Sequence, residues 1–278
     1  MKIAVIKIGG KTINDFTSTD VWVNTISDLY RIYDGIIIVH GAGKDITEWS
    51  NRLGIESNFV NGQRITTKEM MDVVAAVQAG MLNSKIVAKL NSSGFEASGF
   101  SGIDRNTFAA DYLDKLLGFV GKPKLIGSIG WILDLLSERV IPVFSSVCCD
   151  RTGNLMNVNA DLFTGTLSLA VSADTVFFVS DVSGVLMNGN VQKQLDEKQI
   201  EYGVANGEIK DGMIPKLFSC MELLKSGINK IWIGSEIKFK LDKQKEINSA
   251  VCGMNGSGTW IINNIEKGSE LVTLTKHI

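Results

Sequence analysis

The chain begins with Ile3-Ala4-Val5-Ile6-Lys7-Ile8-Gly9-Gly10, where a run rich in β-branched residues leads through a lysine into two glycines. Near-continuous apolar runs, without strict polar alternation, are typical of parallel strands buried on both faces of a sheet. The glycines allow the backbone to approach a ligand closely, and their N–H groups can bind anionic oxygens. This stretch therefore predicts a buried parallel strand that ends at a binding site.

Four further short apolar runs recur along the chain, and helical patterns lie between them. The helical pattern over 21–32 follows capping groups at 17–20, and a second over 67–91 follows Thr66-Thr67, with Glu69 nearby. Alternating strands and helices predict an α/β three-layer sandwich with a central, mostly parallel open sheet, whose ligand sites lie at the carboxyl ends of strands. The four runs cover 35–39, 140–144, 175–179 and 230–233.

The length of 278 residues permits one large unit or two lobes, and we expect two lobes. The boundary is expected near 171–174, because the later strands bring a second set of glycine turns. This gives an N-terminal lobe over 1–172 and a C-terminal lobe over 173–278. The least periodic segments, 106–124 and 188–211, are expected to form a hairpin-like excursion and a surface loop with a helix.

Composition excludes several classes of function. A formal net charge of −2 gives no basic field for nucleic acid or an anionic membrane, and 45% apolar residues is ordinary for a globular protein. We find no signal peptide and no run of about 18 to 20 apolar residues, so we expect a cytoplasmic protein with reduced thiols. No C-x-x-C spacing is present and the histidines are few, so no metal site is expected. The residues concerned are Cys148, Cys149, Cys220, Cys252, His40 and His277.

Two lysines and one aspartate suggest phosphoryl transfer, which requires positive charge around the moving group. Lys7 lies between a strand and a double glycine, and Lys216 follows Gly212-Met213-Ile214-Pro215 near a helix start. Asp161 follows two asparagines at the start of a predicted helix. It would either hold both lysines by ion pairing or complement the helix dipole, and its spacing alone does not decide between these.

Other residues after the strands have both structural and functional interpretations. The 41–43 turn matches neither the G-x-x-x-x-G-K-[ST] loop nor the G-x-G-x-x-G fingerprint, and a tight connection would explain it equally well. Asn157 and Asn159 would bind a substrate or satisfy their own backbone. Arg64 has the planar fork that fits a carboxylate, or it is an exposed surface charge. His40 and the pair Cys148-Cys149 are interpreted as structural.

In chain order, these motifs resemble the amino acid kinase superfamily, most closely the acetylglutamate kinases of arginine biosynthesis. The resemblance covers nearly the whole chain, and Met156-Asn157-Val158-Asn159-Ala160-Asp161 is its most family-specific part. The other segments that carry it are 7–10, 39–43, 61–66, 117–121, 180–185, 211–216 and Gly258-Thr259.

The resemblance implies transfer of the ATP γ-phosphoryl group to the side-chain carboxylate of N-acetyl-L-glutamate, with Mg²⁺ bridging the phosphates. It makes Lys7, Asp161 and Lys216 the catalytic residues. A carboxylate is already an anionic nucleophile at neutral pH, so no general base is required. Substrate binding is implied for Gly41, Ala42, Gly43, Arg64, Asn157 and Asn159, and ATP binding for Gly9, Gly10, Ser180, Asp181, Gly212 and Met213.

Three departures from the family pattern bear on these expectations. Ala42 replaces a usual glycine, and its methyl group would clash if the position needs a positive φ. Arg105 replaces the glycine of a usual Asp-Gly pair, so the hairpin over the substrate is expected to differ. The chain starts directly at its first strand, without the N-terminal helix of arginine-inhibited hexamers, so an arginine-insensitive homodimer is expected.

Two alternative functions remain open on the sequence. One is a sister kinase acting on aminoadipate or glutamate attached to a carrier protein, which would need a basic surface that this chain does not evidently offer. The other is a non-catalytic ligand sensor on the same fold. A sensor would be expected to lose a charged group, whereas Lys7, Asp161 and Lys216 are all present.

Overall fold

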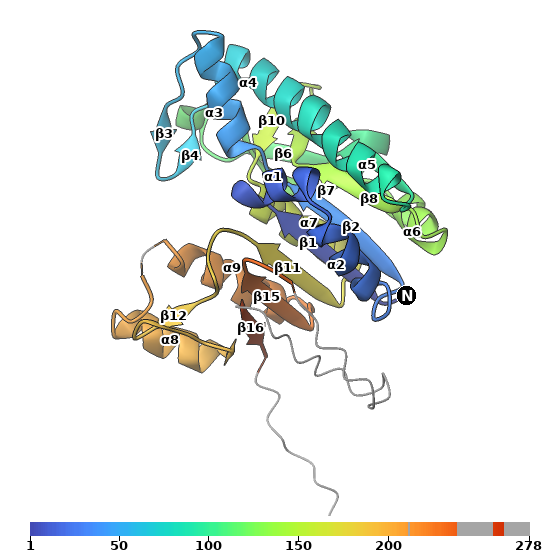
Figure 1. Cartoon of the computed structure of the whole chain (residues 1–278). Coiled ribbons are helices and arrows are strands. Elements are labelled where there is room, and N and C mark those ends of the chain that lie inside the picture. Colours follow the sequence, from blue (N-terminus) through green and yellow to red (C-terminus); the bar gives the residue numbers. More distant parts are fainter. Residues whose placement is uncertain (211, 238–257, 264–278) are drawn as a thin grey trace, which may run out of the picture.

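The central sheet of the computed structural model, which describes residues 1–210, 212–237 and 258–263, has eight strands in the order β14-β16-β15-β11-β1-β2-β8-β5 (Figure 1). Every pairing in it is parallel except that of β15 with β16. All five predicted strands belong to it, so the predicted mostly parallel open sheet is confirmed. The bounds are β1 Ile3–Ile8, β2 Gly35–His40, β5 Ala97–Ser101, β8 Ile141–Ser145, β11 Thr175–Val179, β14 Gln194–Leu195, β15 Lys230–Gly234 and β16 Gly258–Ile262.

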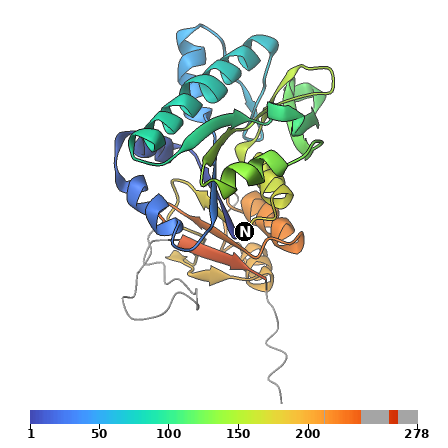
Figure 2. The same ribbon diagram turned by 90° about the vertical axis from the view of Figure 1, so that its right-hand side faces the viewer.

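Helices cover both faces of this sheet and complete the three layers (Figure 2). One face carries α1, α2 and a long helix that begins at Lys68, and the other carries α6, α7 and α9. α3 packs against α4, and α8 against α9. The bounds are α1 Lys11–Ser18, α2 Val21–Leu29, α3 Gly43–Arg52, α6 Gly130–Ser137, α7 Ala160–Ala170, α8 Glu197–Ala205 and α9 Ile214–Lys225.

The alternation of side chains along β1 determines where its lysine points. Ala4, Ile6 and Ile8 belong to the core beneath α1 and α2, whereas Ile3 and Val5 belong to the core beneath α6, α7 and α9. Because successive side chains of a strand point to opposite faces, Lys7 shares the face of Ile3 and Val5. The sequence position of Lys7 therefore directs its ammonium toward α7 and α9.

The long helix that begins at Lys68 contains a π-helical segment. It consists of α4 Lys68–Val74, the π-helix Ala75–Leu82 and α5 Asn83–Ser92, and Thr67 caps it by accepting a hydrogen bond from the Met70 N–H at 3.2 Å. This confirms the predicted helix and its cap. Among the described residues it is the one helix long and apolar enough to cross a membrane, and its inner face packs against β5 and β8.

A four-stranded sheet in the order β6-β7-β10-β9 lies beside the main one. β6 and β7 are antiparallel, which confirms the predicted hairpin-like excursion, while β12, β13, β14 and α8 form the predicted loop with a helix. Two short hairpins, β3–β4 and β12–β13, complete the strands. The bounds are β3 Phe59–Val60, β4 Gln63–Arg64, β6 Phe108–Tyr112, β7 Val120–Leu125, β9 Val147–Cys149, β10 Leu155–Val158, β12 Leu186–Met187 and β13 Asn190–Val191, with short 3₁₀ turns at Asp104–Asn106 and Lys115–Leu117.

The predicted cap of α2 was wrong, although the helix begins where expected. Within the described part of the chain, no side-chain hydrogen bond caps its N-terminus. The hydroxyls of Thr17, Ser18 and Thr19 instead donate back to carbonyls of α1, as in the 2.6 Å bond from Ser18 Oγ to the Asn14 carbonyl. Asp20 forms an ion pair with Lys89 at 2.6 Å. The hydroxyls lie closer to the end of the preceding helix than to α2, so they satisfy carbonyls there.

Candidate active site

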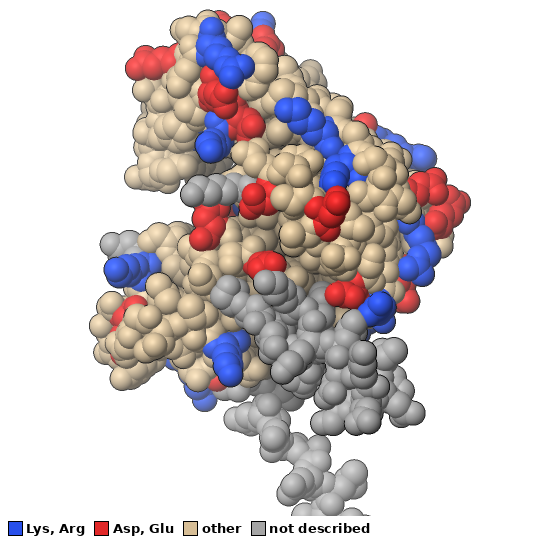
Figure 3. Space-filling view, in the orientation of Figure 1, with Lys and Arg blue, Asp and Glu red and all other residues tan. Residues whose placement is uncertain are grey.

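The turns that follow the parallel strands meet at one edge of the main sheet. Ile8 lies opposite both His40 and Val179 in register, and Val179 lies opposite Gly234. The predicted ligand-binding turns after β1, β2 and β11 are therefore neighbours. The molecular surface is hollowed between the part that carries β3–β4 and the part that carries α8 (Figure 3).

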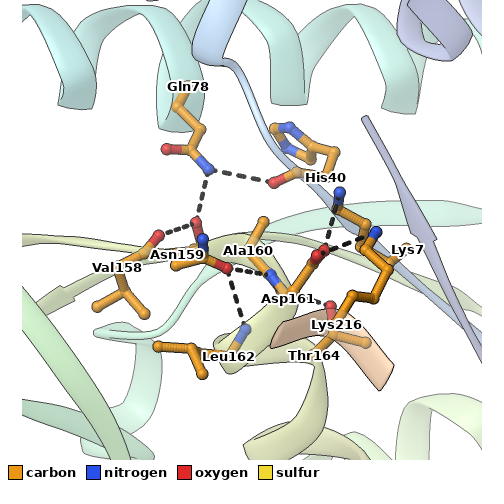
Figure 4. A network of polar contacts seen from close by, with 11 residues as sticks. Lys7, His40, Gln78, Val158, Asn159, Ala160, Asp161, Leu162, Thr164 and Lys216 are labelled. Atoms are coloured by element: carbon orange, nitrogen blue, oxygen red, sulfur yellow. Dashed lines mark hydrogen bonds and ion pairs between the residues drawn. The ribbon is translucent and has the colours of Figure 1, made fainter. Parts of the chain in front are cut away.

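Lys7 and Lys216 converge on Asp161 (Figure 4). Lys7 Nζ lies 2.9 Å from Asp161 Oδ1, and Lys216 Nζ lies 3.2 Å from Oδ2. The three side chains come from the end of β1 and the first turns of α7 and α9. Asn159 fixes the start of α7, because its Oδ1 accepts hydrogen bonds from the N–H groups of Asp161 and Leu162. Of the two interpretations of Asp161, ion pairing is the one the structure shows.

Asp161 remains a carboxylate in this environment. Burial alone would raise its pKa, but the charges and hydrogen bonds of Lys7 and Lys216 outweigh burial and hold the pKa below its usual value. The side chain of Asp161 is 29% exposed, so solvent screens part of this interaction. One anion thus holds two cations in place at neutral pH.

A side chain at either glycine after β1 would displace a charged neighbour. A Cβ on Gly9 would lie 2.8 Å from Lys7 Nζ. Gly10 has φ 57°, and a Cβ there would lie 2.4 Å from Asp181 Oδ1. The turn after β1 therefore lies against the turn after β11, as the predicted nucleotide site requires. Of the other predicted ATP residues, the Ser180 N–H donates to the Gly234 carbonyl, and Gly212 and Met213 directly precede α9.

A cavity of about 230 Å³ opens beside Lys7 and Asp161. All six residues predicted to bind the substrate line it, so the structure brings the predicted acceptor site together. The predicted ATP residues lie outside this lining. The predicted lining residues are Gly41, Ala42, Gly43, Arg64, Asn157 and Asn159; the others are Ile46, Phe59, Gly62, Gln63, Gln78, Val120, Ser146, Val158 and Ala160.

Arg64 is a buried side chain fixed by hydrogen bonds, and not an exposed surface charge. It is 7% exposed, and its guanidinium donates to Ser57 Oγ at 2.6 Å, Thr47 Oγ1 at 2.7 Å and the Gly43 carbonyl at 2.9 Å. It also lies 4.6 Å from the centre of the Phe59 ring. Three of its five N–H groups are committed to these bonds, which leaves two to bind an anion in the cavity.

The two substitutions that depart from the family pattern differ in their backbone conformation. Ala42 has φ −153°, so its methyl group causes no left-handed strain and the clash that a positive φ would bring does not arise. Arg105 has φ 53° and occupies the left-handed conformation that favours glycine. Its guanidinium lies 6.0 Å from the centre of the Trp131 ring.

A polar network that sequence reasoning missed joins the end of β2 to the end of β10. Gln78 Nε2 donates to the His40 carbonyl at 3.1 Å and to Ser146 Oγ at 2.8 Å, and Ser146 donates to the Val158 carbonyl at 2.7 Å (Figure 4). Gln78 lies on the π-helical segment, and such segments are frequent at functional sites. The only signal in the sequence was one amide within an otherwise apolar stretch.

His40 is structural, as expected. It is fully buried, its Nδ1 lies 3.2 Å from the Gly41 carbonyl and its Nε2 lies 3.1 Å from Asn83 Nδ2. The carbonyl only accepts hydrogen bonds, so the proton belongs on Nδ1, and Nε2 accepts from the Asn83 amide. Burial lowers the pKa of His40 to about 4, so it is neutral near pH 7.

The cysteines show no activated thiol in the part of the chain that the structure describes. Cys148, Cys149 and Cys220 are free, and burial raises the pKa of all three, that of Cys220 to about 12. Within residues 1–210, 212–237 and 258–263, no three His, Cys, Asp or Glu side chains form a group that could hold a metal ion. Cys252 and His277 lie outside the described residues.

Comparison with known proteins identifies the family. The amino acid kinase family model matches residues 2–235, which is most of the chain. The chain belongs to the amino acid kinase family. Among curated members it is similar to the acetylglutamate kinase of Bacillus licheniformis, with 37% identity over 88% of this chain and 98% of that protein. It is also similar to that of a Geobacillus species, with 35% identity over 84% of this chain and 90% of that one.

Solved structures share the fold of this amino acid kinase. The smu.665 protein of Streptococcus mutans superimposes with a TM-score of 0.76 at 29% identity, covering 84% of this chain and 95% of that one. Carbamate kinase from Giardia lamblia bound to AMP-PNP gives a TM-score of 0.65 at 14% identity, over 94% of this chain and 98% of that one. The second match supports the fold alone.

Proposed function

We propose that this kinase transfers the γ-phosphoryl group of ATP to the side-chain carboxylate of N-acetyl-L-glutamate, a step of arginine biosynthesis. An oxygen of the carboxylate forms a bond to the γ-phosphorus as the bond from that phosphorus to the β,γ-bridging oxygen breaks. The products are an acyl phosphate and ADP. The observation that carries this proposal is the convergence of Lys7 and Lys216 on Asp161 at one end of a cavity that also holds Arg64.

The electrostatics of this cluster suit a reaction between two anions. A carboxylate and a triphosphate repel one another, and fixed ammonium groups offset that repulsion where charge shifts in the transition state. Asp161 stays ionised and holds both lysines, so little reorganisation is needed during the reaction. The acceptor carboxylate is ionised at neutral pH, and no protein base is required.

The acceptor would lie along the cavity, with its side-chain carboxylate toward Lys7. The backbone N–H groups of the 41–43 turn would bind the reacting carboxylate, and the φ of Ala42 allows that turn without strain. An uncommitted N–H group of Arg64 would bind the α-carboxylate. Asn159 would donate from Nδ2 to the acyl carbonyl, because only its Oδ1 caps α7, and Asn157 would lie beside the acyl group.

ATP would lie across the adjoining turns. Gly9 and Gly10 would offer N–H groups to phosphoryl oxygens, and Ser180, Asp181, Gly212 and Met213 would line the nucleotide site. Apart from Gly9 and Gly10, these residues lie in the 173–278 part, so we keep the division into an acceptor lobe over 1–172 and a nucleotide lobe over 173–278, although the sheet is continuous across both.

The donor set of the site fits Mg²⁺ that is bound mainly through ATP. Mg²⁺ prefers oxygen ligands and commonly uses substrate phosphates with one or two carboxylates. Asp161 is committed to the lysines, whereas Asp181 lies against Gly10 and would reach the phosphates or their bound water. Bound there, Mg²⁺ would neutralise the phosphate oxygens.

We further propose a cytoplasmic homodimer that arginine does not inhibit. The acceptor lobe would supply the dimer contact. Light scattering coupled to size exclusion would give the subunit count, and activity titrated against L-arginine would test the insensitivity. A hexamer that arginine inhibits would contradict this part of the proposal without affecting the chemistry.

Hydroxylamine trapping of the acyl phosphate tests the function directly. Purified protein, ATP and Mg²⁺ would be tested with N-acetyl-L-glutamate, L-glutamate, L-aspartate and L-2-aminoadipate, and Asp161→Asn would serve as the impaired control. We expect hydroxamate from N-acetyl-L-glutamate at the highest kcat/KM. Preference for L-2-aminoadipate or L-glutamate would point to a sister kinase. Binding of acceptor without any acyl phosphate would identify a sensor.

A further inference from the structure

Gln78 has an unusual position among the residues that line the acceptor cavity. Its side chain is 2% exposed, yet it carries a full amide into an otherwise apolar part of the long helix. The neighbouring buried residues of the π-helix are Val77 and Leu82. A buried amide in such surroundings is favourable only when its donors and its acceptor find partners.

The orientation of this amide is determined by its two hydrogen bonds. Nε2 donates to the His40 carbonyl, which only accepts, so the nitrogen and not the oxygen must lie there. Ser146 Oγ accepts the second bond because its own proton goes to the Val158 carbonyl. The opposite amide orientation would place oxygen against oxygen at His40. Oε1 therefore points away from His40 (Figure 4).

Oε1 accepts no hydrogen bond from any residue in the described ranges, although Gln78 lines the cavity. Asn157 offers a rival acceptor: its Nδ2 donates to Thr66 Oγ1 at 3.0 Å, which leaves its Oδ1 available. Asn157 is half-buried and held by one side-chain bond, so water can solvate that oxygen. Gln78 is 2% exposed and held by two, and its Oε1 is not among the unpaired atoms that are closed off from solvent, so this oxygen can be reached from the cavity that the residue lines.

We propose that Gln78 is a specificity-determining residue whose Oε1 accepts the amide N–H of the N-acyl amino acid. This inference rests on the function proposed above. Arg64 supplies donors only and Asn159 has its oxygen committed to α7, so neither can accept an N–H. Gln78 thereby selects acceptors whose α-nitrogen carries a proton within a planar amide, and rejects analogues in which that position lacks a donor.

A matched pair of acceptors isolates the contact: N-acetyl-L-glutamate and its ester isostere, (S)-2-acetoxyglutarate, in which oxygen replaces N–H. A site built around a substrate N–H discriminates strongly against an analogue that lacks it, because the buried acceptor is then unpaired. We expect wild-type kcat/KM to favour the amide by about 100-fold. In Gln78→Leu, which replaces the amide with an apolar side chain of similar size, we expect the preference to fall below about tenfold.

Two further variants test whether the amide preference is due to Gln78. Ser146→Ala removes one bond to Nε2 but keeps Oε1, so the amide preference should persist. Asn157→Ala removes the rival acceptor, and its preference should also persist. An amide preference that survives in Gln78→Leu and collapses in Asn157→Ala would overturn the proposal. If Gln78→Leu does not fold, Gln78→Met takes its place in the same comparison.

A binding measurement provides a readout that does not depend on turnover. The amide proton of ¹⁵N-labelled N-acetyl-L-glutamate should shift on binding to wild-type protein and shift by a different amount in Gln78→Leu; identical shifts would overturn the proposal. Wild-type phosphorylation of both compounds at equal kcat/KM would overturn this inference and leave the proposed function standing. Acyl phosphate from neither compound would overturn the proposed function itself.

Discussion

The acceptor side of the site and the nucleotide side are built by different means. On the acceptor side, side chains are held in place by other side chains and carbonyls: Arg64 by three hydrogen bonds and Gln78 by two. On the nucleotide side, the recognisable features are glycines whose neighbours leave no room for a Cβ, such as Gly10 against Asp181. The first side presents fixed polar side chains, and the second presents backbone.

This difference suggests what each side can discriminate. Fixed side-chain donors and acceptors distinguish one small acceptor from another, because a mismatched group leaves a buried polar atom unpaired. Backbone N–H groups bind phosphate, which every nucleoside triphosphate shares. Lys7 and Lys216 stand between the two sides, joined through Asp161, so they should be the residues on which both depend.

The largest expected effect is the loss of either lysine. Lys7→Ala and Lys216→Ala should each lower kcat by about 100- to 1000-fold, because a fixed positive group that stabilises the transferring phosphoryl is removed. Steady-state kinetics with circular dichroism to verify folding would measure this. Lys122→Ala, at an exposed position on β7, is the matched control and should stay near wild type. Near-normal kcat in both Lys7→Ala and Lys216→Ala would contradict the proposed mechanism.

The next largest effect concerns the stability of the acceptor side as pH falls. His40 has a pKa of about 4 in the fold against an ordinary value of 6.5, so below pH 6.5 the unfolded chain binds a proton that the folded chain does not. Stability is greatest above pH 6.5 and is lost as pH falls toward 4. The contribution is about 3 kcal/mol across that window.

Urea unfolding at pH 7, 5.5 and 4.5 would measure this loss. His40→Gln should flatten the dependence between pH 6.5 and 4, because the titrating group is gone. Asp161 acts in a lower window, since its depressed pKa yields stability that is lost only as pH falls below the ordinary carboxyl range. A pH dependence identical in wild type and His40→Gln would show that this histidine is not held neutral by the fold.

Much of the fold could be predicted because its signals are local. The apolar runs of β1, β2, β8, β11 and β15 each lie within two residues of their observed bounds, since a strand buried on both faces must be apolar along its length. The cap of α2 could not be predicted. Hydroxyls at 17–19 had carbonyls of α1 within reach, and this competition depends on where the preceding helix ends.

The residues of the site likewise differ in whether the local sequence predicts them. Lys7, Asp161 and Lys216 were recognisable because Lys7 precedes a double glycine at the end of an apolar run, and the other two lie at predicted helix starts within the motifs that carry the family resemblance. Gln78 was not, since its function depends on contacts with His40 and Ser146, which lie 38 and 68 positions away. The π-helical segment that carries Gln78 has no pattern of its own in the sequence.

A smaller effect is expected where the nucleotide side relies on glycine. Gly10→Ala should destabilise the fold by about 1 to 2 kcal/mol, because φ is 57°. It should also raise the KM for ATP by about tenfold, since the methyl group displaces Asp181 from the turn. Gly54→Ala is the matched control: φ is 70° with nothing within 4 Å, so it should lose similar stability with unchanged kinetics. Equal ATP kinetics in both variants would contradict the assignment of this turn to ATP.

The smallest expected effect is on the free energy of unfolding, when two adjacent serines on the acceptor side are each replaced by alanine. Ser145 Oγ is buried and has no hydrogen-bond partner among the residues that the structure describes, whereas Ser146 Oγ joins Gln78 to the Val158 carbonyl. Ser145→Ala should therefore raise the free energy of unfolding by about 1 kcal/mol, because an unsatisfied buried group is removed. Ser146→Ala should lower it by about 1 kcal/mol and raise the KM of the acceptor. Urea unfolding and acceptor kinetics on both variants measure this, and equal stability changes would show that hydrogen bonding does not distinguish these neighbours.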